Sequence, residues 1–334
     1  MGYQNVATPR FYIDKTAYLR TVGISRPNSG EDCFGLNPSN PYSFTGNGQS
    51  MYFDFGNYNN ILHSESYNFY AILGHTLKAD EDGYESIGLA WSDDNHIQDA
   101  EADNTQTLIN ASDASEFVVE LDGFSIMPFA EFSEPHYKMY VSPTTTVNGF
   151  NVQLGRVAIG KYYDMPHSPD LSLTMSHSYE GIKQITTKGG STLSNANYHK
   201  PPKWGENREA WQLGDFPYYY NGRRSWDLSF SFISDSDIEP YSYYGNKYTS
   251  DTIETNPTIQ EGTDNWFQNV LYYTMGGHLP FIFCPDPSIV YYDGAGEPPR
   301  VPEFAICRFD MSTFKRTQVA HKMYTISVKL RETW

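Results

Sequence analysis

Two stretches of the chain alternate apolar and polar residues with a period of two. The apolar positions are Trp226, Leu228, Phe230 and Phe232 in RRSWDLSFSFIS, and Ile326, Val328 and Leu330 in YTISVKLRE. Successive side chains of a β-strand point to opposite faces of its sheet, so this period places all these residues on buried faces. An α-helix would need apolar residues every three to four positions. We therefore expect both stretches to be strands with one face in water.

Strand signals also fill the first half of the chain, where short apolar segments are separated by Gly, Asn, Asp and Pro turns. The segments expected to form strands are Gln49–Phe55, Phe69–Leu73, Ser86–Trp91, Glu116–Leu121, Lys138–Ser142 and Asn151–Ile159. The abundance of aromatic residues, with 27 Tyr and 20 Phe, fits strands better than a helical bundle. The predicted fold class is mostly β, with a β-sandwich at the N-terminus.

The length of the chain predicts two domains, since 334 residues exceed the usual size of a single core. We place the boundary near Tyr163–Pro169, where the last strand of the sandwich gives way to the proline-punctuated sequence DMPHSPD. The prediction is a sandwich domain over residues 1–165 and a second β-rich domain over residues 166–334.

One helix is predicted in the second domain, at DNWFQNVLYYTM, residues 264–275. Its apolar face would comprise Phe267, Val270, Leu271 and Thr274. Asp264 can cap its N-terminus, and Gly276-Gly277 supplies a left-handed stop. We expect a buried strand, Leu279–Phe283, to follow, so that the helix packs onto a sheet.

Two long segments, 188–222 and 235–262, match no secondary-structure element. Structureless loops beyond about 15 residues are uncommon in compact domains unless they are functional or disordered. The Trp and Tyr residues of these segments are unlike the composition of a solvated linker. We interpret both segments as arms that become ordered against a partner. The alternative is that they fold back over their own domain.

The charge of the chain disfavours nucleic acid as a partner. A formal charge of −17 repels phosphate backbones, and no basic stripe is present to neutralise them. No run of about 18 apolar residues is available to span a bilayer, and the N-terminus has no signal-peptide pattern. We therefore expect no nucleic-acid or membrane partner and a soluble, unexported chain.

The positions of His75 and of the cysteines in the sequence are typical of buried structural residues. His75 follows Gly74 at the end of the apolar run NFYAIL, which suits an imidazole that anchors a strand end by hydrogen bonds. The other histidines are scattered, and Cys33, Cys284 and Cys307 match no C-x-x-C spacing. We expect a structural His75, small buried cysteines, no disulfide framework, no metal site and no cofactor.

Local signatures of hydrolases, zinc proteases and nucleotide-binding enzymes are missing from the sequence. Ser312 and Lys315 have the S-x-x-K spacing, but the other motifs of that chemistry are absent. Acidic pairs such as Asp80 with Asp82 would serve glycoside hydrolysis or calcium binding only if their oxygens converged, and a solvated hairpin turn is the simpler interpretation. The chain is predicted not to be an enzyme, with glycoside cleavage as an alternative.

Several segments carry a resemblance to a known class of proteins. YFDFG at 52–56, NFYAILGHTL at 68–77 and IGLAWSDD at 87–94 together resemble the galactose-binding-like jelly-roll element of virion structural proteins of tailed bacteriophages. FNVQLGRVAIGKYYDMP, GGSTLSNANYHKPPKW and RRSWDLSFSFISDSD are similar to parts of tail-tip or baseplate-associated phage proteins, so the resemblance touches roughly residues 1–235. Thr76 departs from the pattern, in which Asn is usual.

The resemblance implies a jelly-roll sandwich at the N-terminus and an assembly subunit of a phage tail, tail tip or baseplate. Such a subunit is located in the virion and is made in the host cytoplasm. No catalytic residues carry over, and glycan binding does not transfer from the fold alone.

Aromatic side chains of the first arm are the predicted contacts between subunits, because Tyr and Trp supply a large contact area with little rotamer entropy to lose. They are Trp204, Trp211, Tyr218, Tyr219 and Tyr220. We expect a non-enzymatic structural subunit that forms symmetric copies through its arms and binds other virion structural proteins. The alternative is a carbohydrate-binding or host-receptor-binding module, in which Trp91 would stack on a sugar ring and glycan would be a partner.

Overall fold

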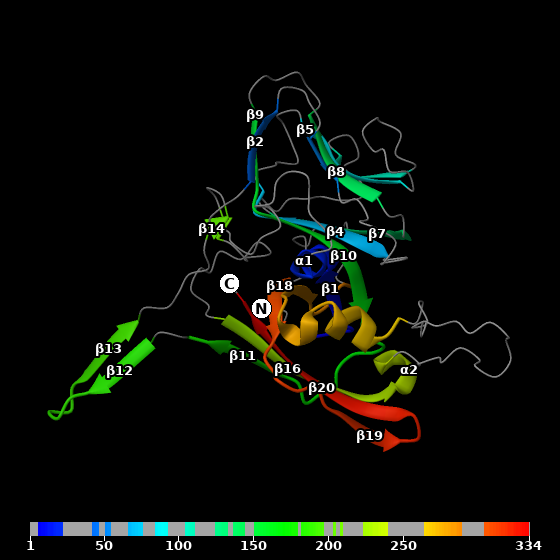
Figure 1. Ribbon diagram of the computed structural model, residues 1–334. Coiled ribbons are helices and arrows are strands. Elements are labelled where there is room, and N and C mark those ends of the chain that lie inside the picture. The colour runs from blue at the N-terminus through cyan, green and yellow to red at the C-terminus, as the bar shows by residue number, and fades with distance from the viewer. Residues whose placement is uncertain are drawn as a thin grey trace, which may run out of the picture. The chain divides into compact units, whose positions relative to one another are not determined.

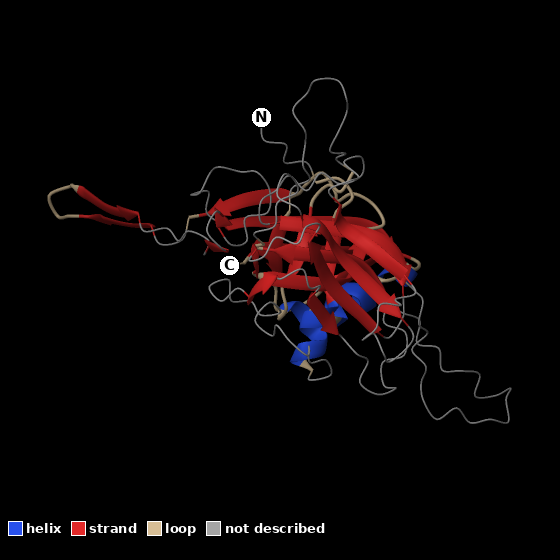
Figure 2. Cartoon of the chain, turned by 90° about the horizontal axis from the view of Figure 1, so that it is seen from above, coloured by secondary structure: helices blue, strands red, loops and turns tan. Residues whose placement is uncertain are grey.

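The computed structural model describes residues 6–22, 42–46, 51–54, 66–75, 84–92, 104–110, 124–132, 136–143, 150–179, 182–196, 203–204, 208–209, 223–239, 264–288 and 304–333. Most of these residues lie in β-strands (Figure 2). The mostly-β fold class is therefore confirmed, while the jelly-roll order of strands stays a prediction. The predicted strand Glu116–Leu121 lies outside the described residues.

The chain groups into two compact units. Among the described residues, unit 1 takes those within 1–13, 162–178 and 223–333, and unit 2 takes those within 14–161 and 179–222. Each unit is therefore built from more than one segment of the chain. The domain ranges expected from the sequence, 1–165 and 166–334, stay a prediction, and their boundary falls near the passage from unit 2 to unit 1 between Lys161 and Tyr162.

Unit 1 is organised around antiparallel strands that come from all three of its segments (Figure 1). In sheet order they are β11 (Thr174–Ser178), β16 (Arg223–Ser234), β20 (Met323–Glu332), β18 (Ala305–Phe309), β17 (Phe281–Cys284) and β1 (Arg10–Asp14), and β19 (Arg316–Ala320) also pairs with β20. The N-terminal β1 pairs with β17, where Arg10 lies opposite Cys284. The sheet therefore cannot form without long-range pairing.

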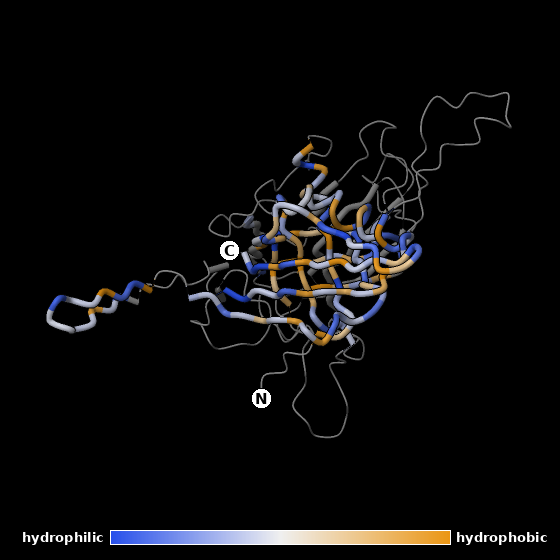
Figure 3. The backbone as a smooth tube through the Cα atoms, turned by 90° about the horizontal axis from the view of Figure 1, so that it is seen from below, coloured by the Kyte–Doolittle hydropathy of each residue, from blue (hydrophilic) through white to orange (hydrophobic). Residues whose placement is uncertain are grey.

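The alternation predicted for the two amphipathic strands is confirmed in all but one position. The buried residues are Ile326, Val328 and Leu330 in β20, and Trp226, Leu228 and Phe230 in β16. Figure 3 shows hydrophobic and hydrophilic positions alternating along strands of the sheet. The expectation for Phe232 was wrong, because its side chain is 68% exposed.

A bulge explains the exposure of Phe232. The register between β16 and β20 shifts between Phe230 and Ile233, and Phe232 takes a φ of 62°. A bulge inserts one extra residue and interrupts the period of two. Ile233 therefore takes the buried place that the alternation had assigned to Phe232.

A helical segment is present where the sequence predicts one, but its geometry is irregular. It consists of a π-helix, Phe267–Tyr272 (η2), and a 3₁₀ turn, Met275–Gly277 (η3). Ahead of this segment, Asn265 Oδ1 accepts the Gln268 N–H at 2.8 Å, whereas the expected cap, Asp264, accepts a hydrogen bond from the side chain of Asn269 at 2.9 Å. The wider π-helical turn also changes the buried face. Val270 is fully buried as expected, whereas Phe267 is 45% exposed, so its placement on the apolar face was wrong.

The end of this segment and the strand after it follow the prediction. Gly276 and Gly277 have φ values of 66° and 101°, and a Cβ on Gly277 would meet the Phe309 Cβ at 3.0 Å. All four residues of β17 are buried. Trp266 packs edge-on against Phe11 of β1, with ring centroids 5.0 Å apart, and so ties the helical segment to the core of unit 1.

Most of β10 (Arg156–Asp164) lies in unit 2, where it pairs with β4 (Tyr67–Leu73), which in turn pairs with β7 (Phe124–Phe132). The described residues of unit 2 also form four smaller antiparallel sheets: β3 (Met51–Asp54), β8 (His136–Pro143), β5 (Tyr84–Ser92) and β6 (Asn104–Asn110); β2 (Tyr42–Gly46) with β9 (Phe150–Leu154); β12 (Ile182–Thr186) with β13 (Thr192–Ala196); and β14 (Lys203–Trp204) with β15 (Arg208–Glu209). Every residue of β4 is buried, and so is His75 just after it. The expected position of His75 at the end of a buried strand is confirmed.

Two short helices were not predicted. In unit 2, α1 (Lys15–Thr21) begins after Asp14, whose side chain accepts the Ala17 N–H. In unit 1, α2 (Asp235–Ile238) begins after Ser234, whose side chain accepts the Asp237 N–H. Because Ile238 is buried, the second predicted arm, 235–262, starts as a packed helix and not as an unstructured segment.

Candidate assembly interface

The first predicted arm, 188–222, begins within a β-hairpin formed by β12 and β13 (Figure 1). The two strands pair antiparallel from Ile182 opposite Ala196 to Thr186 opposite Thr192, and they form a two-stranded sheet of their own. The hairpin begins at residue 182, before the predicted start of the arm at residue 188. Part of the arm therefore has a regular structure that the sequence analysis missed.

The turn between the strands is closed by its own hydrogen bonds. The Thr187 N–H donates to Ser191 O at 2.8 Å, and the Gly190 N–H donates to Thr187 O at 2.9 Å. The Ser191 N–H donates to Thr187 Oγ1 at 3.1 Å. Gly190 has a φ of 85°, a conformation that glycine adopts without strain. The turn therefore fixes the register of the hairpin locally.

The side chains of the hairpin are exposed. All five residues of β12 and residues 192–195 of β13 are open to solvent. Ile185 and Leu193 lie directly opposite each other and share one face, with 63% and 61% of their surface exposed. A two-stranded hairpin is at best marginally stable alone in water. An exposed cross-strand pair of branched apolar side chains is a surface that gains from being covered.

The charge of the hairpin differs in sign from that of the whole chain. Residues 182–196 contain Lys183 and Lys188 and no Asp or Glu, whereas the chain carries a formal charge of −17. Figure 3 shows hydrophilic and hydrophobic positions mixed along these two strands. The hairpin is therefore a weakly basic, partly apolar ribbon on an acidic protein, and an acidic surface is its electrostatic complement.

A second open feature is the edge of the sheet in unit 1. Within the part of the chain that the structure describes, β11 is the terminal strand and pairs only with β16, from Thr174 opposite Asp227 to Ser178 opposite Arg223. Four of its five residues are exposed. A terminal strand presents one row of backbone N–H and C=O groups with no strand partner.

Few of the aromatic contacts predicted from the sequence can be placed. Trp204 ends β14, opposite Arg208 in β15. Trp91, which was expected to stack on a sugar ring in the alternative function, lies in β5 opposite Tyr137 and so belongs to a different sheet. Trp211 and Tyr218–Tyr220 lie outside the described residues. The candidate interface is therefore based on the hairpin. The sequence signal that could have predicted it is TTKGGS, a turn-forming stretch between two short segments that contain β-branched residues.

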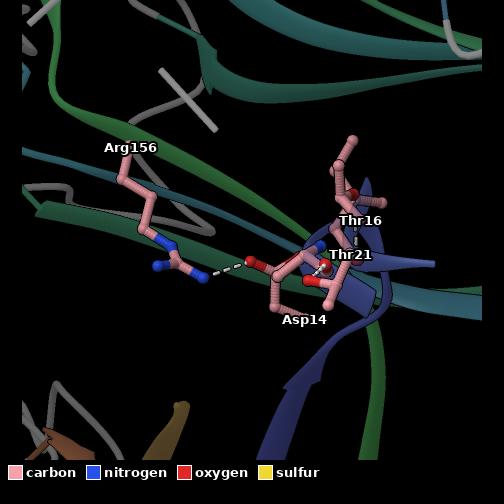
Figure 4. Close-up of polar contacts among 6 residues, drawn as sticks. Asp14, Thr16, Thr21 and Arg156 are labelled. Carbon is pink, nitrogen blue, oxygen red and sulfur yellow. Dashed lines mark hydrogen bonds and ion pairs between the residues drawn. The ribbon is translucent and has the colours of Figure 1, made fainter. Parts of the chain in front are cut away.

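Buried charges in unit 2 serve the structure. Arg156 Nη2 donates to Asp14 Oδ2 at 2.5 Å (Figure 4), and the two side chains are only 4% and 5% exposed. Asp14 Oδ1 also accepts the Ala17 N–H at 3.0 Å at the start of α1. Both oxygens of this carboxylate are therefore engaged in an ion pair and a helix cap, an arrangement that holds α1 and the start of β10 together.

Charged pairs in unit 1 are likewise built into the sheet. Glu332 continues the buried face of β20 and accepts hydrogen bonds from the Arg224 guanidinium, at 2.9 Å from Nη2. Arg224 also donates to Phe304 O at 3.0 Å. At the other end of the unit, Arg10 forms a two-point ion pair with Asp164 at 2.6 and 2.8 Å. These geometries are typical of structural Arg–carboxylate pairs.

The two cysteines in the described residues, Cys284 and Cys307, are buried as predicted. Burial raises the pKa of Cys284 to about 12 and raises the pKa of Cys307 as well. A nucleophilic cysteine needs a lowered pKa, so neither thiol is suited to chemistry. Cys33 lies outside the described residues.

Comparison of the chain with protein-family models, curated proteins and solved structures gave no match. In the described ranges, no three His, Cys, Asp or Glu side chains gather in a way that could hold a metal ion. None of the helices in the described part of the chain has the length and apolar character needed to cross a membrane.

Proposed function

We propose that the chain is a non-enzymatic structural subunit that assembles with copies of itself through the β12–β13 hairpin. The observation that carries this proposal is the exposed pair of Ile185 and Leu193 on a hairpin that its own turn closes. Strand elements of this kind suit assembly, because main-chain hydrogen bonds supply affinity and alternate side chains supply specificity. A preformed hairpin also loses less conformational entropy on binding than an unstructured arm.

Charge supports copies of the same chain as the partner. Acidic subunits repel one another unless the contact brings opposite charges together. Lys183 and Lys188 give the hairpin a positive charge, and the remainder of each copy is acidic. The contact between a hairpin and a neighbouring copy is therefore electrostatically favourable.

The resemblance to virion structural proteins of tailed bacteriophages supports a position in the tail, tail tip or baseplate, where symmetric copies form rings. This position is testable by mass spectrometry of purified particles from a host that produces the protein. Peptides of the chain should be present in stoichiometric amounts, and particles that lack them would contradict a place in the virion.

Sedimentation velocity over a concentration series tests the assembly itself. The test variant replaces Ile185 and Leu193 with Thr, which places a β-branched residue suited to a strand at both positions but removes the apolar contact. The matched control replaces Gln184 and Ser194 with Thr, since these residues lie directly opposite each other on the other face of the same hairpin. The natural chain should form defined multimers. The test variant should self-associate at least about tenfold more weakly than the natural chain. The control variant should self-associate as strongly as the natural chain.

Two results would contradict the proposal. One is a natural chain that stays monomeric at every concentration. The other is an equal effect of both double substitutions, which would mean that the apolar face has no special part in association.

A further inference from the structure

The terminal strand of unit 1 lacks the features that normally protect a sheet edge. Natural edge strands are blunted by Lys, Pro, bulges or a covering element. β11 has the sequence TMSHS, with no Lys, Arg or Pro, and it pairs with β16 over five residues without a shift in register. Four of its five residues are exposed, and in the described part of the chain no strand pairs with its outer edge. This edge is open to an additional strand.

A second exposed strand that pairs with the same sheet, β19, differs in this respect. β19 is also exposed along its whole length, but it starts at Arg316 and is flanked by Lys315 and Lys322. Arg316 is already engaged in an ion pair with Glu239. A basic strand disfavours the approach of a hairpin that itself carries two lysines. Of these two strands, β11 is the one that suits the hairpin.

The hairpin has the complementary properties of an entering element. Each of its strands is five residues long, as is β11, and each has one edge that no described strand occupies. The residues Tyr179–Gly181 are all that separates β11 from β12 along the chain. Every copy therefore carries both an open edge and a strand element that can fill such an edge. Two different surfaces on one chain generate a head-to-tail contact, which closes into a ring when the rotation allows.

We propose that the outer edge of β11 receives the β12–β13 hairpin of a second copy of this chain and extends the sheet of unit 1 by two strands. This inference rests on the proposed function and names the surface that the hairpin occupies. The contact is made by backbone hydrogen bonds along β11 and by burial of Ile185 and Leu193 beside the extended sheet. Its occupant is a second copy because the hairpin is basic and the receiving protein is acidic.

Disulfide trapping between separately substituted chains tests this assignment. One protein carries Thr174→Cys or Ser176→Cys in β11, and the other carries Gln184→Cys or Ser194→Cys in the hairpin, all with Cys33→Ser. The buried Cys284 and Cys307 stay in place. Paired residues on adjacent strands have Cα atoms about 4.5–5.5 Å apart, a range that a disulfide spans. The matched control replaces the β11 cysteine with one in another exposed strand, by Thr317→Cys in β19.

After mild oxidation of the mixture, a β11 cysteine and a hairpin cysteine should form a cross-linked dimer. The Thr317→Cys protein should form much less cross-linked dimer with the same hairpin cysteine. Equal trapping at β19 and β11, or none at β11, would overturn the assignment. A second protein carries Ser176→Cys and Gln184→Cys in one chain. If it forms an internal disulfide as a dilute monomer in place of cross-linked multimers, the hairpin belongs to its own β11 and the assignment fails.

The sedimentation experiment separates the two levels of the proposal. If multimers depend on Ile185 and Leu193 but trapping at β11 fails, only the receiving edge is wrong and the proposed function stands. If the natural chain does not associate at all, the proposed function and this inference both fail.

Discussion

Ile185 and Leu193 lie directly opposite each other across β12 and β13, and each keeps more than 60% of its surface exposed. The turn between Thr187 and Ser191 holds this pair in register through backbone and side-chain hydrogen bonds. An apolar pair that is fixed in position and left uncovered is prepared for a contact. This relationship supports the proposed role of the hairpin in assembly, which its sequence alone, with only three large apolar residues, did not indicate.

The buried ion pair of Asp14 and Arg156 should matter far more for stability than an exposed pair. Asp14→Ala removes the partner of a buried guanidinium and the cap of α1, so the free energy of unfolding should fall by about 3–5 kcal/mol. Glu131→Ala is the matched control, because Glu131 is 48% exposed in its ion pair with Lys161. That substitution should cost less than about 1 kcal/mol. Urea unfolding followed by circular dichroism measures both, and equal losses would refute the structural role given to Asp14.

Phe230 and Phe232 offer a test of the bulge in β16. Phe230 is fully buried, so Phe230→Ala should lower the free energy of unfolding by about 3–5 kcal/mol. Phe232 is 68% exposed, so Phe232→Ala should change it by less than about 1 kcal/mol. Thermal and urea unfolding of the two variants provides the comparison. A regular strand without the bulge would instead give two large and similar losses.

Local sequence patterns predicted those parts of the fold that depend on neighbouring residues. The period of two placed Ile326, Val328 and Leu330 on the buried face of β20, and the glycine pair Gly276-Gly277 marked the left-handed end of the helical segment. The same period failed at Phe232, because a bulge depends on pairing with a distant strand and leaves no local signal. The short α1 was missed although Asp14 supplies its cap, since it follows directly on a strand.

The candidate interface could not be predicted from the sequence, because it depends on strand pairing between distant residues and on which side chains are exposed. Arg10 lies opposite Cys284, and no pattern near either residue specifies that pairing. The aromatic residues chosen as contacts, such as Trp204, were selected by residue type, whereas the exposed hairpin is defined by the geometry of its strands and turn. The arm 188–222 was singled out by its length and composition, whereas the regular structure of the hairpin depends on the cross-strand register from Ile182 to Ala196.

Alkaline pH should weaken the fold through its buried thiols. Burial raises the pKa of Cys284 from 9.0 to about 12, so above pH 9 the unfolded state releases a proton that the folded state retains. The stability that this neutral thiol contributes is fully present below pH 9 and is lost as the pH rises towards 12. Urea unfolding across this window should show a shallower loss of stability for Cys284→Ala than for the natural chain. An unchanged slope would mean that the thiol is accessible to solvent.

Hydrogen–deuterium exchange at increasing protein concentration tests the central claim most directly, since it follows the hairpin without any substitution. In a dilute monomer, the amides of residues 182–196 should exchange rapidly, because an isolated two-stranded hairpin is marginally stable. Peptides covering residues 182–196, together with those covering β11, should become protected as multimers form, while β19 should be unaffected. Exchange of the hairpin that is equally fast at every concentration, in a sample shown to contain multimers, would contradict assembly through this element.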